Sequence, residues 1–251
     1  MSGSRKPESE AWRSLMTIWT FTDQEVAAMA DASPSRGRGR PRAGEELDTG
    51  RLLQAALEAF AEKGYDGMSV RELARGLGIS HALLTARYGS KEGLWFAAME
   101  HAATGSVRIW QQATNTPELD DLEALRQGIV RQVVFAAAYP QLHRIMSHEG
   151  AVDSPRVRFV VDRFINPLRP LVEQLLDRLV AAGRIRPLPY ATLHYLVVSG
   201  GGALFASPVE ARLLGAPDTF DEDAIHRHAE AVAGVIINGI RNSQGEQQAT
   251  A

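Results

Sequence analysis

The chain has 251 residues, enough for one large domain or two modest ones, and its 45% hydrophobic and 23% charged content excludes a wholly disordered protein. It contains no Cys, which excludes disulfide bonds, thiol nucleophiles and cysteine-ligated metal centres. The formal net charge is −3, so binding to nucleic acid would require a local basic patch rather than a basic surface overall.

We expect residues 1–45 to form a flexible N-terminal extension. Its first residues, Met1 to Ala11, are polar and charged and lack the apolar core of a secretory signal, so we expect a cytoplasmic protein. Pro, Gly, Ser and Arg dominate from Ser33 to Ala43, a composition with nothing to bury. The apolar stretch from Trp12 to Phe21 indicates no particular function.

The extension carries a basic arm. Arg38-Gly39-Arg40-Pro41 resembles the core of an AT-hook, an extended segment whose arginines enter the narrow minor groove of A·T-rich DNA. A basic run of this kind is often only a solvated tail, and both interpretations stay open. If the arm binds DNA, the contacts predicted are those of Arg38, Arg40 and Arg42.

A group of short helices is predicted between residues 46 and 106. The first begins at Asp48 or Thr49 and ends at Gly64, and its apolar residues recur with the spacing of an amphipathic helix. The second begins at Ser69, where Ser69 and Glu72 have the spacing of a capping box. Both predictions rest on local signals that mark where a helix begins and ends.

Gly78 separates this second helix from a third, predicted from Ser80 to Tyr88, and Ser90 caps a fourth. Two short helices joined by a tight glycine turn over residues 69–88 have the dimensions of a helix-turn-helix unit. We expect small side chains on the outer face of the third helix to allow close approach to a groove, with Leu83 and Tyr88 facing inward or lying at the rim. The predicted DNA contacts of this region are Ser69, Ser80, His81, Ala82, Leu83, Thr85, Arg87, Tyr88 and Lys91.

A pattern of matched positions extends through this region. It reads Leu52-Leu53-x-x-Ala56-x-x-x-Phe60-x-x-x-Gly64-Tyr65, then Ser69-Val70-Arg71-Glu72-Leu73-Ala74, Gly78-Ile79-Ser80, Leu84, Tyr88 and Ser90-Lys91-Glu92-x-Leu94. With this pattern, residues 46–106 resemble the DNA-binding region of the TetR family of bacterial repressors. The resemblance implies an all-α fold, in which an N-terminal three-helix helix-turn-helix domain precedes a C-terminal helical domain for ligand binding and dimerisation.

The resemblance also implies roles for particular residues. The helix Ser80–Tyr88 would lie in the major groove, and Lys91 would contact a phosphate. Two positions depart from the family: Thr85 stands where an aromatic residue is usual, and Arg87 where His or Tyr is usual. Thr85 has a shorter reach, so Arg87 and the basic arm would have to compensate for a weaker phosphate contact.

Residues 107–243 are predicted to be helical, and residues 244–251 to be a disordered tail. The predicted helices are Leu119–Ala138, Pro140–His148, Arg156–Ala182, Tyr190–Phe205 and Asp221–Ile240. Pro167 and Pro170 are expected to kink or restart the third of them. The uncharged run from Pro187 to Val209 contains prolines and three glycines, which favours a buried helix over a membrane span.

The family resemblance calls for a small-molecule site in this second domain, and such pockets are mostly apolar with a few polar groups. Aromatic residues at helical spacing more often pack in a core, so each candidate has that alternative. The candidate pocket residues are Trp110, Phe135, His143, Met146, Glu149, Phe159, Phe164 and Tyr195.

A glycine run points to a dimer interface. Gly200, Gly201 and Gly202 fall within a predicted helix, where each glycine costs about 1 kcal/mol relative to Ala. Close approach of a helix from a second subunit would offset this cost, so we expect the last two helices to form a two-fold four-helix interface. Ala231, Val235 and Ile236 supply apolar positions for it, and the alternative is that the glycines merely end their helix.

We therefore interpret the chain as a ligand-responsive DNA-binding regulator, a homodimeric repressor that a small, largely apolar molecule releases from double-stranded operator DNA. Enzymes are disfavoured because no nucleophile, metal or nucleotide-binding motif occurs, and no cofactor, metal or membrane association is expected. The alternative is a protein of the same fold that has lost DNA binding and acts through protein interactions; Thr85 and the net negative charge are compatible with it.

Overall fold

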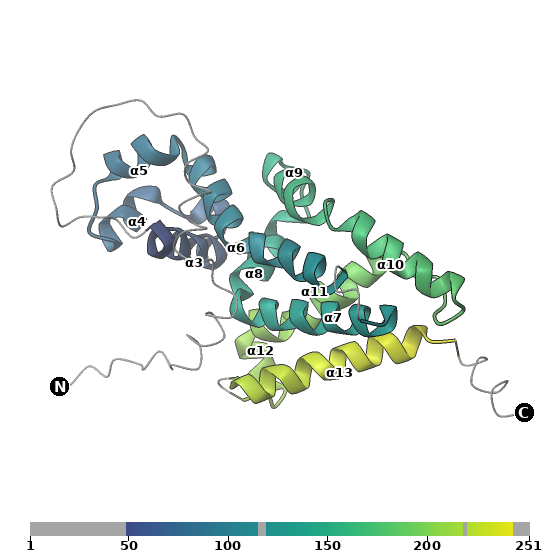
Figure 1. Cartoon of the computed structure of the whole chain (residues 1–251). Coiled ribbons are helices and arrows are strands. Elements are labelled where there is room, and N and C mark those ends of the chain that lie inside the picture. The colour runs from purple at the N-terminus through teal and green to yellow at the C-terminus, as the bar shows by residue number, and fades with distance from the viewer. Residues whose placement is uncertain (1–48, 115–118, 218–219, 243–251) are drawn as a thin grey trace, which may run out of the picture. The chain divides into compact units, whose positions relative to one another are not determined.

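Figure 1 shows the chain as a computed structural model, which describes residues 49–114, 119–217 and 220–242. The described residues form helices without a strand, as the sequence predicted for an all-α fold. The basic arm with Arg38, Arg40 and Arg42, and the tail 244–251, lie outside the described residues.

The N-terminal helices begin and end close to the predicted positions. They are α3 (Thr49–Gly67), α4 (Val70–Gly76), α5 (His81–Tyr88) and α6 (Lys91–Thr114). The predicted end of α3 at Gly64 is a kink, because Gly64 has φ 70° and ψ 171° and the helix resumes to Gly67. Ser69 caps α4 as predicted, but the carboxylate of Glu72 accepts a hydrogen bond from Lys63 Nζ (3.1 Å) instead of completing a capping box.

The C-terminal helices match four of the five predicted segments. They are α7 (Asp121–Ala138), α8 (Pro140–Glu149), α9 (Pro155–Val160), η1 (Val161–Ile165), α10 (Arg169–Ala181), α11 (Tyr190–Ala206), α12 (Pro208–Leu213) and α13 (Glu222–Ile240). The helix predicted over Arg156–Ala182 is interrupted near Pro167 and Pro170, as expected, but the chain forms α9, a π-helical turn and α10 in succession rather than one long helix. Asn166 N donates to Val161 O (2.7 Å) in this turn, just ahead of Pro167, which has no N–H to continue the helix.

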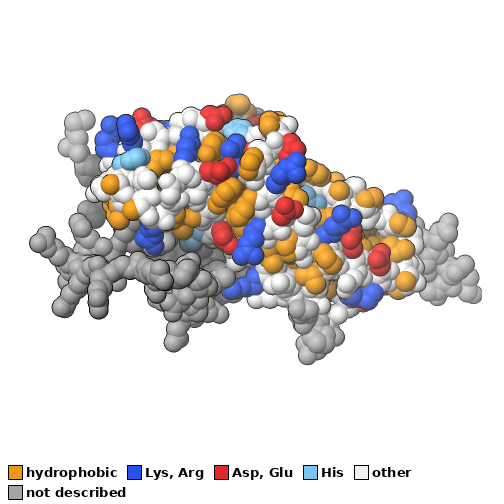
Figure 2. Space-filling model, turned by 90° about the horizontal axis from the view of Figure 1, so that it is seen from above, with side chains coloured by type: hydrophobic (Ala, Val, Ile, Leu, Met, Phe, Trp, Pro, Cys, Tyr) orange, Lys and Arg blue, Asp and Glu red, His pale blue; other side chains and the backbone are white. Residues whose placement is uncertain are grey.

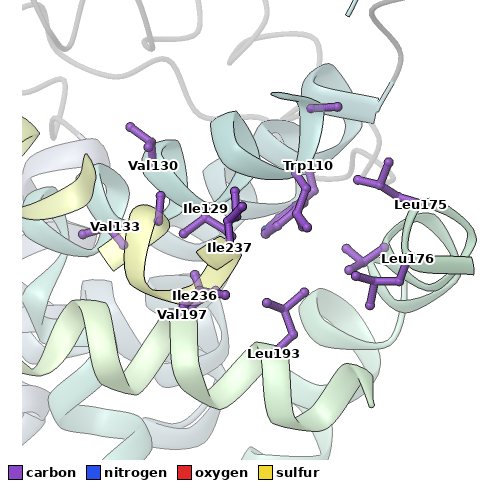
Figure 3. Close-up of a cluster of buried hydrophobic side chains, with 14 of the residues drawn as sticks. Trp110, Ile129, Val130, Val133, Leu175, Leu176, Leu193, Val197, Ile236 and Ile237 are labelled. Carbon is purple, nitrogen blue, oxygen red and sulfur yellow. The ribbon is translucent and has the colours of Figure 1, made fainter. Parts of the chain in front are cut away.

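α7 forms the centre of the C-terminal helices, where α6, α11 and α13 pack against it. Figure 3 shows Trp110 of α6, Ile129 and Val133 of α7, and Ile237 of α13 in one buried cluster. Each such side chain contributes about 1.5–3 kcal/mol on burial, so the cluster fixes these helices as one unit. None of the described helices has the length and apolar character needed to cross a membrane.

α3 links the N-terminal helices to the rest, because it packs on both α6 and α8. Its buried face consists of Leu52, Leu53, Ala56, Leu57, Phe60 and Ala61. α3 therefore lies between α6, whose first residue is Lys91, and α8 of the C-terminal part.

Candidate nucleic-acid interface

The turn between α4 and α5 has a compact set of backbone hydrogen bonds. Gly78, at φ 69°, is in the left-handed region that favours glycine, and Ile79 N donates to Ala74 O at 3.0 Å. Ser80 then caps α5, where its Oγ accepts from Leu83 N at 3.1 Å. The hydroxyls of Ser69 and Ser80 are thus engaged at the starts of their own helices, and the two helices are held as a helix-turn-helix pair.

α5 exposes most of its predicted contact residues. Leu84 is buried at 2% exposure and fixes the inner side of the helix, while His81, Ala82, Thr85 and Arg87 are exposed as expected. Leu83 is 45% exposed and faces outward, contrary to the expectation that it faces inward or lies at the rim. An apolar side chain on the outer face is thus available for contact with a partner.

Tyr88 differs from its prediction as a DNA contact. The side chain is half-buried, and the hydroxyl oxygen is enclosed without a hydrogen-bond partner among the described residues. Burial raises the pKa of this phenol, although the neighbouring Arg87 opposes the shift. The hydroxyl is not presented to a groove, so Tyr88 acts in packing the end of α5.

The two basic candidates are positioned by α3. Arg87 Nη2 donates to Thr49 Oγ1 at 2.7 Å, and its guanidinium lies 5.7 Å from the centre of the Tyr88 ring. Lys91 Nζ donates to Asp66 O at 3.2 Å and lies 4.8 Å from the centre of the Tyr65 ring. These contacts hold the cations near the surface of the N-terminal helices, where phosphate oxygens could replace or add to their present partners.

A hollow of about 260 Å³ joins three of the predicted residues: His81, Thr85 and Lys91 all line it. Ser90 lies in its wall and caps α6 through a hydrogen bond from Gly93 N (3.0 Å), so the helix begins at this edge of the hollow. The hollow is suited to binding a phosphate group, because the ammonium group of Lys91, the imidazole of His81 and the N-terminus of α6 lie around it.

The surrounding surface has a local excess of positive charge. Figure 2 shows Lys and Arg side chains at the end of the molecule where α5 lies in Figure 1, beside a broad area of uncharged side chains. Between residues 70 and 91 the charged side chains are Arg71, Arg75, Arg87 and Lys91 against Glu72 alone. This is the local basic patch that a chain of net charge −3 requires for DNA binding.

A contact that the sequence reasoning missed connects this surface to the C-terminal helices. The guanidinium of Arg156 lies 3.7 Å from the centre of the Tyr65 ring, the same ring that Lys91 approaches. Arg156 Nε donates to Glu149 Oε2 at 2.9 Å, and Ser154 Oγ donates to the same oxygen at 3.3 Å. A buried carboxylate needs a cationic partner, but the sequence shows neither that Glu149 is buried nor which cation pairs with it.

Two family models match the chain over both predicted domains. Residues 52–98 match a model described as bacterial regulatory proteins, tetR family. Residues 118–246, more than half of the chain, match a model described as tetracyclin repressor-like, C-terminal domain. The chain belongs to the TetR family.

Curated relatives of this TetR-family chain are regulators of transcription. The HTH-type transcriptional regulator RutR of Escherichia coli (strain K12) is 27% identical over 197 residues, which is 76% of this chain and 89% of RutR. The HTH-type transcriptional activator FasR of Mycolicibacterium smegmatis is 27% identical over 140 residues, 53% of this chain and 64% of FasR. The chain is accordingly a helix-turn-helix transcription regulator, and its family and relatives are not enzymes.

Solved structures share the TetR fold. The ketosteroid transcriptional regulator KstR2 of Mycobacterium tuberculosis aligns with a TM-score of 0.62 and 18% identity over 81% of this chain and 100% of KstR2. The regulator PfmR of Thermus thermophilus aligns with a TM-score of 0.59 and 24% identity over 77% of this chain and 97% of PfmR. These likenesses confirm the N-terminal helix-turn-helix region followed by a helical C-terminal domain.

The candidate pocket residues of the TetR C-terminal domain fall into separate groups. Trp110 is in the central core, and Phe159 and Phe164 pack edge to face 5.8 Å apart beside Trp95 and Phe96. Glu149 is buried but paired with Arg156, and Met146 on the same helix α8 is partly buried. Tyr195 differs from its expected place in a pocket, because it is 67% exposed on α11.

Two of the candidates, Phe135 and His143, lie near the α7–α8 junction. The Phe135 ring lies 5.0 Å from the ring of Tyr139, and His143 is half-buried. A Cβ on Gly202 of α11 would lie 3.6 Å from His143 Nδ1, which places α11 beside this group. Burial lowers the pKa of His143 and favours the neutral imidazole, although a hydrogen bond with the Val198 backbone opposes the shift.

The glycine run packs differently from the prediction. A Cβ on Gly201 would lie 2.5 Å from Val133 Cγ2, and one on Gly202 would lie 3.1 Å from Ala136 Cβ. The close approach predicted for a second subunit is therefore made by α7 of the same chain, whereas Gly200 has open space around it. On α13, Ile236 is likewise buried in the core of the chain, while Ala231 is exposed and Val235 is 74% exposed.

Proposed function

We propose that this chain is a ligand-responsive repressor whose helix α5 enters the major groove of operator DNA while Lys91 contacts a phosphate. The observation that carries the proposal is the exposed outer face of α5 beside the hollow that His81, Thr85 and Lys91 share with the start of α6. The major groove of B-DNA admits an α-helix, and small outward side chains let the helix approach the base edges. Such a regulator acts in the cytoplasm, where bacterial DNA lies.

The proposed effector is a small, largely apolar molecule that binds near the α7–α8 junction. Phe135, Tyr139 and His143 are half-buried there, and Gln141 Oε1 is enclosed without a hydrogen-bond partner among the described residues. A neutral imidazole and an unpaired amide oxygen beside aromatic rings suit an uncharged ligand with one donor. The ligand shifts the equilibrium from the DNA-binding conformation to the DNA-free one only to the extent that it binds the DNA-free conformation more tightly.

DNA binding is tested by its dependence on salt, with genomic fragments selected by the protein as probes. The logarithm of the affinity should fall linearly with the logarithm of the salt concentration, with a slope of about −0.9 for each phosphate contacted. Lys91→Ala should weaken binding to all sequences and reduce this slope by about 1, measured by fluorescence anisotropy. The combination with Arg87→Ala should abolish the shift of operator fragments in a gel without unfolding the chain.

Arg169→Ala is the matched control, since Arg169 is an exposed cation that pairs with Glu173 on α10. It removes the same charge and should leave the slope unchanged. Deletion of residues 1–43 should make the salt dependence shallower, with a slope closer to zero, if Arg38, Arg40 and Arg42 contact DNA. An unchanged slope would count against DNA binding by the arm. A wild-type chain that binds no fragment even at low salt would contradict the proposed function.

We also propose a homodimer formed by the outer faces of α11 and α13. Apolar side chains are exposed there, with Tyr195 at 67%, Leu196 at 44% and Val235 at 74% exposure. Gly200 is open and Ala231 is exposed on the same two helices, which leaves room for a helix of a second copy. Exposed apolar groups on adjacent helices are typical of a protein–protein interface.

Val235→Asp should shift this dimer toward monomer at low micromolar concentration, because the interface would have to bury a carboxylate without a partner. Sedimentation velocity measures the change. Val152→Asp, at a side chain that is 63% exposed just after α8, is the matched control and should sediment like the wild type. A wild-type chain that sediments only as a monomer would exclude the interface.

A further inference from the structure

The outermost residues of α5 carry no group that could read a base pair by paired hydrogen bonds. Leu84 is buried and Tyr88 half-buried on the inner side, and Ala82 and Ala86 lie one helical turn apart on the opposite side. Leu83 and Thr85 flank them, and all four are exposed. Bidentate recognition of guanine or adenine requires Arg, Lys, Asn or Gln, which this outer ridge lacks.

Two polar side chains of α5 donate hydrogen bonds to partners within the chain. Arg87 donates to Thr49 Oγ1 of α3 at 2.7 Å, and Thr85 Oγ1 donates to the carbonyl oxygen of His81 at 3.1 Å. His81 lines the hollow beside Lys91, at the edge where a phosphate is proposed to lie. What the helix offers to the centre of a groove is therefore mainly the methyl groups of Ala82, Leu83 and Ala86.

We infer that α5 recognises its DNA through the C5-methyl groups of thymine, so that its half-sites are A·T-rich at the positions the ridge contacts; the inference rests on the proposed DNA binding. Thymine is the one base that presents a methyl group in the major groove. Contact between this methyl and the ridge removes apolar surface from water. A G·C pair at the same position has no methyl group to offer, so it lacks this apolar contact with the ridge.

The test removes the methyl and nothing else. The full chain selects duplexes from a random-sequence library, and each thymine of the selected half-site is then replaced by deoxyuridine, which keeps its pairing with adenine. Each contacted thymine should weaken binding about fourfold on replacement, the equivalent of about 0.8 kcal/mol for one buried methyl-sized group. Replacement of a thymine by deoxyuridine outside the selected half-sites is the control and should leave the affinity unchanged.

Selected half-sites without A·T preference, or affinities that stay within about twofold after every replacement inside the half-site, would overturn the inference while leaving DNA binding intact. Failure to select any duplex would instead contradict the proposed function, and the inference with it. The two failures are distinguishable because only the first yields a measurable complex.

A variant assigns the contact to the helix. Leu83 is 45% exposed, so Leu83→Ala should leave the unfolding midpoint unchanged while it abolishes the deoxyuridine penalty at one position of each half-site. Leu213→Ala, at a 79% exposed position on α12, is the matched control and should keep every penalty. A Leu83→Ala chain that retains the full penalty at every position would overturn the assignment of this contact to Leu83.

Discussion

Gly93→Ala should destabilise the chain by about 2 kcal/mol, although helix propensity alone predicts that it stabilises by about 1 kcal/mol. Gly93 is the third residue of α6, and a Cβ there would lie 2.1 Å from the carbonyl oxygen of Tyr88 and 3.3 Å from its carbonyl carbon. Tyr88 ends α5, and only Gly89 and Ser90 connect it to α6. The clash is with backbone, so it is relieved only if the junction between α5 and α6 opens.

Opening this junction should also weaken DNA binding. It moves α5 away from Lys91, and the proposed complex needs both in contact with DNA. The loss of one good contact reduces the affinity about tenfold. Urea unfolding gives the stability and fluorescence anisotropy gives the affinity. Gly76→Ala is the control from the same part of the chain, because a Cβ there meets no atom within 4 Å. A Gly93→Ala chain as stable as Gly76→Ala would show that the junction tolerates the methyl.

The helix boundaries of the N-terminal region could be predicted because their causes are local. Ser69 and Ser80 accept hydrogen bonds from amides three residues along, and Gly78 adopts the positive φ of its turn. The π-helical turn at Val161–Ile165 and the short helix α12 could not be predicted in this way. Two prolines indicate an interruption, but whether the chain kinks or widens depends on how the turn η1, with the buried Phe164, packs against α6, which is distant in the sequence.

The sequence named candidate residues for the site, but not the partners that their side chains have in the structure. The family pattern singled out Lys91, and Glu149 was a candidate only for the ligand pocket. The placement of the Tyr65 ring between Lys91 and Arg156 depends on contacts between segments far apart in the chain. The outward position of Leu83 was missed because an apolar side chain in an amphipathic helix is expected to face the core. The glycines of α11 indicated a close approach correctly, but the sequence does not show whether the approaching helix comes from the same chain.

Arg156→Met should destabilise the chain by about 3 kcal/mol, because it leaves the carboxylate of Glu149 buried without its cation. The side chains of Glu149 and Arg156 are 8% and 18% exposed, and Ser154 Oγ is the hydrogen-bond donor that remains on the carboxylate. Arg158→Met is the matched control on the same helix, since its ion pair with Asp153 is 69% exposed on both sides. That variant should unfold in urea at the wild-type midpoint.

A double variant separates the effect of Arg156 on the stability of the chain from its effect on operator affinity. Glu149→Met combined with Arg156→Met replaces the buried ion pair by apolar side chains of similar volume and should recover most of the lost stability. It does not restore the cation over the Tyr65 ring, which lies beside Lys91 at the end of α3. Its operator affinity should therefore stay several-fold below that of the wild type despite the recovered stability. Full affinity in the double variant would show that the position of Lys91 is independent of Arg156, and that the C-terminal helices act on DNA binding by another route.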